Sequence, residues 1–357
     1  MFNITELLIA FLISSIVAFV TTPLIRKFAI KINAVDHPDE DRKKHEEPKA
    51  RIGGLAIVLG VVAGLLYLQP EHPHMTEIII GGIIIIITGL LDDLFNLKPY
   101  QKLIGQIAAA SVIVSAGLII DKLTMPFVGT IELGVFGYIL TFLWIIGVTN
   151  AINLIDGLDG LAAGVSAIGL TSILIIAITD YRIIVVYLCM VMVASCLGFL
   201  YHNFYPAKIF MGDTGALFLG YAIAVISMLG LFKNVALFSF IIPIIIIAVP
   251  IFDTIFAIIR RVINRQSIGQ ADRKHIHYRL LERGYSHPSA VLIIYAFTGA
   301  FGIMAIIFSS ATLLASLIVI ILFILAIQVI AELTGIFSDQ QPILNGIRKM
   351  IGKKENI

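Results

Sequence analysis

Charged residues are scarce in this sequence. They make up only 13% of the 357 residues, whereas hydrophobic residues make up 59%, and the mean hydropathy is +1.00. A soluble globular domain is about a quarter charged and at most half apolar. The composition therefore excludes soluble globular, disordered and fibrous proteins and predicts a protein that crosses a membrane several times. The net charge of +2 gives no indication of nucleic acid binding.

Several chemical signatures are also missing. The only cysteines are Cys189 and Cys196, and their spacing on one helix face predicts buried packing rather than a disulfide or a metal site. The sequence has no Walker A motif, no dinucleotide-binding glycine motif and no nucleophilic serine elbow. The first 20 residues lack a basic start and a cleavage site, so they are predicted to be a retained span. Any active site must therefore be assembled between helices.

About eleven apolar stretches have the length that a membrane-spanning helix needs. The predicted spans are 4–24, 52–69, 77–91, 103–120, 134–150, 161–179, 183–201, 214–231, 235–257, 289–308 and 312–332. Of the 25 basic residues, all but Lys122, Arg182 and Lys233 fall in connections on one side, which the positive-inside rule assigns to the cytoplasm. We therefore expect an all-α polytopic domain over residues 1–335, with its N-terminus outside, and a cytoplasmic tail over 336–357.

Aspartates gather at the predicted cytoplasmic ends of the spans. An ionisable group at membrane depth costs a few kcal/mol and therefore indicates function. The adjacent Asp92 and Asp93 would repel each other unless a cation lay between them, and such oxygen ligands suit Mg²⁺. A solvated helix end is the alternative for this pair. Asp213 is either a metal ligand or the N-cap of the span that follows it.

Amides and acids are concentrated in the segment 150–160. A spacing of three residues places Asn150, Asn153 and Asp156 on one arc of a helix. The two following glycines are expected to end the helix and to let Asp159 return toward the same cavity. A polar turn is the alternative. This segment is a second candidate for contact with a metal or a polar substrate.

The connection 258–288 is basic and contains Arg273, His275 and His277. Cations beside aspartates at the same membrane face would form a clamp for a diphosphate. Attraction to anionic lipids is the alternative, and a zinc site is not favoured because thiolate and carboxylate partners are missing nearby. Carboxylates, a basic loop and a membrane location together indicate phosphoryl transfer to a lipid. The active site is accordingly expected at the cytoplasmic face.

The order of the motifs resembles the polyprenyl-phosphate N-acetylhexosamine-1-phosphate transferase family, and most closely its WecA/TagO branch. The resemblance covers residues 5–330 and rests on Asp92-Asp93, the run from Asn153 to Gly160, Phe210-Met-Gly-Asp213-Thr-Gly, Pro250-Ile-Phe-Asp253-Thr and His275-Ile-His277. Two positions depart from the family pattern. Ala50 replaces a common proline, and Tyr278 replaces a histidine, which puts in doubt any scheme that needs three imidazoles.

The resemblance implies a role for each motif. Asp213 would be the principal ligand of Mg²⁺, or of Mn²⁺, and Asp92 and Asp93 would be the catalytic pair. The residues implied in substrate binding are Lys102, Asn153, Asp156, Asp159, Arg273, His275 and His277. His45 and Arg51, in a basic loop that ends in glycine, and Asp253 are further candidates.

The resemblance also implies a reaction. The protein would transfer GlcNAc-1-phosphate from UDP-GlcNAc to undecaprenyl phosphate in the inner leaflet of a bacterial cytoplasmic membrane. The products would be undecaprenyl-diphospho-GlcNAc and UMP, in the first membrane step of a cell-wall glycan such as teichoic acid. Tunicamycin sensitivity and a homodimer are further expectations. A transporter or lipid flippase is the alternative, but it predicts acidic groups near the bilayer midplane rather than at one edge.

Overall fold

The computed structural model describes residues 3–36, 49–125, 129–230, 241–266 and 274–334. Almost all of the regular structure in these ranges is helical. The helices are α1 (Ile4–Lys31), α2 (Gly54–Leu68), α3 (Met75–Phe95), α4 (Pro99–Ser115), α5 (Val135–Ile155), α6 (Leu161–Thr179), α7 (Ile183–Asn203), α8 (Gly212–Gly230), α9 (Ile241–Ile246), α10 (Ala248–Ile263), α11 (Ile276–Glu282), α12 (His287–Ser309) and α13 (Leu313–Thr334). Two antiparallel strand pairs complete the fold, β1 (Val35–Asp36) with β2 (Lys49–Ala50) and β3 (Lys122–Met125) with β4 (Gly129–Glu132).

The helices confirm an all-α protein with several membrane spans. Within the described residues, eight helices are long and apolar enough to cross a membrane, namely α1, α3, α5, α6, α7, α8, α12 and α13. Helices α2 and α4 coincide with two further predicted spans but have only 15 and 17 residues. At 1.5 Å per residue, 15 residues rise about 23 Å, which is less than the bilayer core of about 30 Å.

The predicted span 235–257 is not one straight helix over its described part. The chain forms α9 and then α10, and Ile247 between them leaves the helical conformation with φ −106° and ψ 30°. Pro250 explains the break, because it has no amide hydrogen to donate to the carbonyl of Ile246, four residues earlier. A hydropathy profile does not detect this break, since both halves are apolar.

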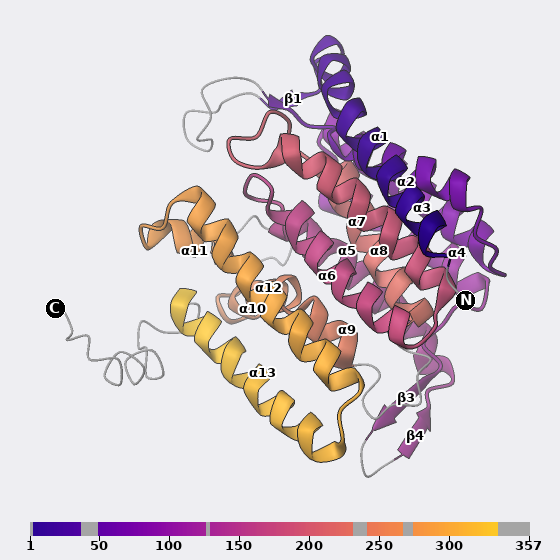
Figure 1. Cartoon of the computed structure of the whole chain (residues 1–357). Coiled ribbons are helices and arrows are strands. Elements are labelled where there is room, and N and C mark those ends of the chain that lie inside the picture. The colour runs from indigo at the N-terminus through magenta and orange to yellow at the C-terminus, as the bar shows by residue number, and fades with distance from the viewer. Residues whose placement is uncertain (1–2, 37–48, 126–128, 231–240, 267–273, 335–357) are drawn as a thin grey trace.

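The helices form a bundle with its most buried elements in the centre (Figure 1). Most of α8, α6 and α7 is buried, whereas α1 and α13 expose most of their apolar side chains, as lipid-facing helices do. The single tryptophan joins α5 to α8: Trp144 Nε1 donates to Ser227 Oγ at 3.0 Å. In Figure 1, β1 and α11 lie at one end of the bundle, and β3 and β4 lie at the other.

A histidine of α7 replaces the hydrogen-bond donor that a proline inside α1 lacks. Pro23 cannot donate to the carbonyl of Phe19, four residues earlier. His202 Nε2 lies 3.0 Å from that carbonyl oxygen and serves as its donor in place of the missing amide. In apolar surroundings a carbonyl without a donor is costly, so this contact fixes α7 against α1.

We expect His202→Phe to lower the stability of the detergent-solubilised protein by about 1 kcal/mol, because the Phe19 carbonyl would lose its donor. Pro23→Ala supplies a backbone amide for the same carbonyl, so His202→Phe should cost clearly less in that background. Thermal unfolding of the four proteins in the double-mutant cycle measures this coupling. Equal losses in both backgrounds would show that the pairing has no energetic role.

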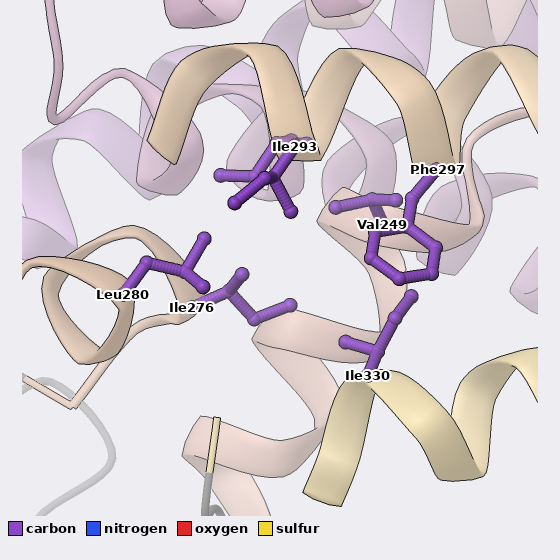
Figure 2. Close-up of a pocket in the computed structure, with 7 residues that line it drawn as sticks. Val249, Ile276, Leu280, Ile293, Phe297 and Ile330 are labelled. Atoms are coloured by element: carbon purple, nitrogen blue, oxygen red, sulfur yellow. The ribbon is translucent and has the colours of Figure 1, made fainter. Parts of the chain in front are cut away.

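An apolar pocket lies where α10, α11, α12 and α13 meet (Figure 2). Its lining residues are Val249, Ile276, Leu280, Ile293, Ile294, Phe297 and Ile330. Ile276 directly follows His275, so the pocket adjoins the histidine-bearing segment. All seven of these side chains are apolar.

Candidate functional site

Three carboxylates from two helices form a compact cluster at one end of the bundle. Asp92, Asp93 and Asp213 each offer an oxygen, and these oxygens lie within 4.8 Å of one another. Asp92 and Asp93 are each only 4% exposed. Both belong to the last turn of α3, which runs on to Phe95. The alternative of a solvated helix end is therefore wrong, and the helix continues four residues past the predicted end of the span at residue 91.

Glycines allow the backbones of three helices to meet at this cluster. A Cβ at Gly89 of α3 would lie 2.6 Å from Thr214 Cα, and one at Gly54 of α2 would lie 2.2 Å from Gly215 Cα. Gly212, with φ +71°, would place a Cβ 1.9 Å from the carbonyl oxygen of Arg51. No side chain fits at these positions, so the ends of α2, α3 and α8 are held in direct contact.

Lys102 supplies a positive charge to the cluster. Its Nζ lies 2.8 Å from Asp92 Oδ2 and 2.5 Å from Asp213 Oδ2. The other oxygen of Asp92, Oδ1, is buried and accepts no hydrogen bond from the described residues. The side chain of Asn153, at the end of α5, lies near Asp213. The structure thus brings Lys102 and Asn153 to the carboxylates.

The cluster fits a divalent cation. Three ionised carboxylates and one ammonium leave an uncompensated negative charge of two, in a site with little solvent. Mg²⁺ prefers oxygen ligands of this kind and is held by one or two carboxylates together with phosphate oxygens and water. The unbonded oxygen of Asp92 and the carboxylate of Asp213 are the best-placed ligands. Among the described residues the cluster contains carboxylates only, and such donors favour Mg²⁺ or Mn²⁺ over softer metals.

Asp213 does not act as the N-cap of α8. The helix begins at Gly212, and Asp213 already belongs to its first turn. The amides of Asp213 and Thr214 instead donate to Asp93, at 2.9 Å and 3.0 Å. The capping carboxylate therefore comes from α3, which the local sequence around Asp213 does not indicate.

The segment 150–160 divides between two environments. Helix α5 ends at Ile155, as the following glycines predict, and Asp156 is its C-cap. Burial, followed by the negative charges of Asp213, Asp93 and Asp159, raises the pKa of Asp156 to about 8. Asp159 instead accepts a hydrogen bond from the amide of Ala207 at 2.9 Å and lies 3.9 Å from Lys49 Nζ. Asp156 is therefore close enough to the carboxylate cluster for their charges to interact. Asp159, by contrast, is hydrogen-bonded to the loop after α7.

Asn150 has a structural partner. Its amide nitrogen donates to Gln106 Oε1 at 2.7 Å, and Gln106 Nε2 donates to Asn150 Oδ1 at 3.2 Å. This reciprocal pair joins α5 to α4. Although Asn150 shares an arc with Asn153, its hydrogen-bonding capacity is used between helices.

The two histidines at the start of α11, His275 as its N-cap and His277 in its first turn, differ in their environment. His275 Nδ1 lies 2.8 Å from Asp253 Oδ2, and Asp253 Oδ1 accepts from the amide of Ile276 at 2.9 Å. A carboxylate paired in this way fixes the orientation of an imidazole. Asp253 thus holds both the His275 ring and the start of α11.

His277 is 1% exposed, and neither of its ring nitrogens has a hydrogen-bond partner among the described residues. Burial lowers the pKa of His277 to about 4, so the ring is neutral at physiological pH. A Cβ at Gly157 would lie 2.1 Å from His277 Nε2. The glycine after Asp156 therefore admits the ring and brings α11 against the end of α5.

The remaining predicted residues lie at the edge of the site or outside the described residues. Arg51 Nη1 donates to Asn96 Oδ1 at 3.0 Å and lies 3.8 Å from Asp36 Oδ1, so it is engaged beside the end of α3. His45 and Arg273 lie outside the described residues. Thr214 belongs to the motif Phe210-Met-Gly-Asp213-Thr-Gly, and Lys49 belongs to the basic loop before Gly53, but sequence reasoning assigned no role to either residue.

The fold and the site define an all-helical, multi-pass membrane protein with a carboxylate-rich centre at one end of its bundle. Residues 75–231 match glycosyl transferase family 4. The chain is 50% identical over 337 residues, covering 94% of both proteins, to a probable undecaprenyl-phosphate N-acetylglucosaminyl 1-phosphate transferase of Bacillus subtilis (strain 168).

Two further relatives agree with this match. A decaprenyl-phosphate N-acetylglucosaminephosphotransferase of Mycolicibacterium smegmatis is 36% identical, over 85% of this chain and 82% of that protein. An undecaprenyl-phosphate alpha-N-acetylglucosaminyl 1-phosphate transferase of Yersinia pestis is 28% identical, over 90% and 88%. The chain therefore belongs to the polyprenyl-phosphate N-acetylhexosamine-1-phosphate transferase family, which confirms the resemblance found in its motifs.

Proposed function

We propose that this protein transfers GlcNAc-1-phosphate from UDP-GlcNAc to undecaprenyl phosphate. The observation that carries the proposal is the buried cluster of Asp92, Asp93 and Asp213 with Lys102, in a chain that shares half its residues with a relative named for this reaction. An oxygen of the lipid phosphate attacks the phosphorus that bears the sugar. The bond from that phosphorus to the oxygen of the UMP portion breaks, and UMP leaves.

In this proposal Asp213 and Asp92 hold Mg²⁺, or Mn²⁺ in its place. The bound ion supplies neutralisation and orientation of the reacting phosphates. Asp92 is the better candidate of the acidic pair to deprotonate the lipid phosphate, because only its carboxylate has an oxygen without a hydrogen bond from the described residues.

Residues around the cluster would bind the donor. Lys102 would bind a phosphate group that lies beside the carboxylates. Asn153 and Asp156, at the end of α5, would help to hold the donor and the metal. His275, oriented by Asp253, and His277 would contact the diphosphate or the sugar. Asp159, Arg51, Arg273 and His45 are further candidates for donor contact. Arg273 and His45 are proposed from their motifs alone.

The basic residues support a topology with about eleven spans, the N-terminus outside and the site at the cytoplasmic face of a bacterial plasma membrane. UDP-GlcNAc would reach this face from the cytoplasm, and undecaprenyl phosphate would reach it from the inner leaflet. The product would be the first lipid-linked sugar of a cell-wall glycan, for which teichoic acid is one candidate. A homodimer is compatible with this arrangement.

The proposal predicts UMP release that requires all three components. Purified protein, undecaprenyl phosphate and UDP-GlcNAc should yield UMP and a lipid diphosphosugar with Mg²⁺, and EDTA should reduce the rate at least about 100-fold. Tunicamycin should inhibit the reaction. UDP-GalNAc, UDP-glucose and UDP-MurNAc-pentapeptide serve as alternative donors. Turnover of the last donor in preference to UDP-GlcNAc, or transfer unaffected by EDTA, would contradict the proposal, and solute uptake by proteoliposomes without UMP formation would favour a transporter.

A further inference from the structure

The carboxylate of Asp93 is fully engaged by the first turn of α8. Its Oδ1 accepts from the amide of Asp213 at 2.9 Å, and its Oδ2 accepts from the amide of Thr214 at 3.0 Å and from Thr214 Oγ1 at 2.6 Å. Thr214 is 0% exposed and Asp93 is 4% exposed. These three hydrogen bonds therefore form without competition from bulk water.

The adjacent Asp92 has a different environment. It pairs through Oδ2 with Lys102, and its Oδ1 is buried without a hydrogen bond from the described residues. Asp92 can thus offer an oxygen to a ligand without breaking a contact. Asp93 would have to give up at least one amide or hydroxyl donor, each of which would then be left buried and unpaired at a cost. The two neighbours are chemically alike but differ in what they can do.

The donors that Asp93 satisfies belong to the beginning of a helix. The first amides of an α-helix have no partner within the helix, and a carboxylate near them is stabilised by the helix dipole. Here the carboxylate lies about 120 residues away in the chain, so the cap also joins α3 to α8. Because one bond goes to the amide of Asp213 itself, the cap fixes the backbone from which the Asp213 carboxylate projects.

The packing around the cap leaves little freedom for α8 to shift. Gly89 lies one turn before Asp93, and a Cβ there would come within 2.7 Å of the Asp213 carbonyl oxygen. A Cβ at Gly212 would come within 2.6 Å of both Asp93 oxygens. The hydrogen bonds and the close backbone contact thus specify the same placement of Asp213 relative to Asp92.

We propose that Asp93 and Thr214 are positioning residues, which hold Asp213 at the distance from Asp92 that a divalent cation needs. The inference rests on the proposed function. It moves Asp93 out of the expected catalytic pair and assigns a role to Thr214, which lies in the motif around Asp213 but was given no role of its own. Residues that orient metal ligands by hydrogen bonds change metal affinity or activity by about 10- to 100-fold when they are lost.

Thr214→Val tests the hydroxyl with little change in size. We expect Mn²⁺ binding, followed by electron paramagnetic resonance in detergent, to weaken at least about 10-fold. Thr214→Ser keeps the hydroxyl and should bind Mn²⁺ within about twofold of the unaltered protein, since it removes only a methyl group. If Thr214→Val does not fold, Thr214→Ala provides a smaller side chain without the hydroxyl. Unchanged Mn²⁺ affinity in the folded variant that lacks the hydroxyl would overturn the proposal.

Asp93→Asn separates positioning from direct chemistry. The NH₂ group of the asparagine would point one hydrogen-bond donor at the backbone amides of Asp213 and Thr214, which are donors themselves. We therefore expect weaker Mn²⁺ binding and faster hydrogen exchange in the peptide that contains residues 211–216. The pH dependence of the residual transfer rate should keep its shape, with the rate lowered by the same factor at every pH. Loss of one limb of that profile, with unchanged hydrogen exchange, would show instead that Asp93 itself transfers a proton.

The outcomes separate this inference from the proposed function. An unaltered protein that binds Mn²⁺ but releases no UMP would overturn the proposed function, while the comparison of Thr214→Val with Thr214→Ser would still decide the positioning role. An unaltered protein that binds no Mn²⁺ would overturn both. If Thr214→Val binds Mn²⁺ more weakly, transfers normally at saturating metal and loses transfer only at low metal concentration, the positioning role is supported.

Discussion

Replacing Asp213 with asparagine is expected to lower the rate of transfer by about 1000-fold and to abolish Mn²⁺ binding. Asp213 and Asp92 share the charge of Lys102, and Asp213 is the carboxylate best placed to act with the unbonded oxygen of Asp92. An asparagine keeps the size of the side chain but removes the negative charge that a dication needs in a site with little water. Losses of this size follow the removal of one preorganised electrostatic group from an active site.

The measurement is UMP release at saturating Mg²⁺, with Mn²⁺ binding recorded separately. Asp121→Asn is the matched control, because Asp121 is exposed and directly precedes β3; Figure 1 shows β3 at the other end of the bundle from β1. It should leave both quantities unchanged. Retention of more than a tenth of the rate by Asp213→Asn, in protein that melts normally, would refute the metal role of Asp213.

Gly157→Ala is expected to cause the second largest loss of transfer activity, together with a loss of stability. The new methyl group would lie 2.1 Å from His277 Nε2, so the ring, which is only 1% exposed, would have to move to admit it. Such overpacking costs about 1–3 kcal/mol, and misplacing the histidine segment should reduce transfer about 100-fold. Thermal unfolding and UMP release measure the two effects.

Gly147, which lies within α5 ten residues before Gly157, provides an internal control. A Cβ there would meet nothing within 4 Å, so Gly147→Ala should keep full activity and gain about 0.5–1 kcal/mol of stability from its higher helix propensity. Combining Gly157→Ala with His277→Ala should restore thermal stability but not activity. If Gly157→Ala behaved like Gly147→Ala, close contact between α5 and α11 would not be needed for transfer.

The limits of sequence inference are clearest at the end of α3. The hydropathy profile ends the predicted span at residue 91, because two aspartates follow. The helix nevertheless continues to Phe95, since Lys102 and the first turn of α8 compensate the two charges. These partners are supplied by the fold, and a local window of sequence cannot contain them.

Two other segments show the same limit. The division of the predicted span 235–257 into α9 and α10 follows from a backbone hydrogen bond that Pro250 cannot make, although the hydropathy is continuous. Asn150 and Asn153 share a helix face, but Asn150 pairs with Gln106 whereas Asn153 lies near Asp213. Helical periodicity shows which side chains share one face of a helix, but it does not show which other helix packs against that face.

The sequence by itself determined that this is a polytopic helical membrane protein, and the order of its motifs indicated its transferase family and candidate residues. Composition, hydropathy and motif order are properties of the chain, so they are available without a fold. Only the tertiary structure decided which carboxylates meet and which donors each one accepts. The contacts responsible join residues 111 and 121 positions apart, and such pairings are set by helix packing rather than by local sequence.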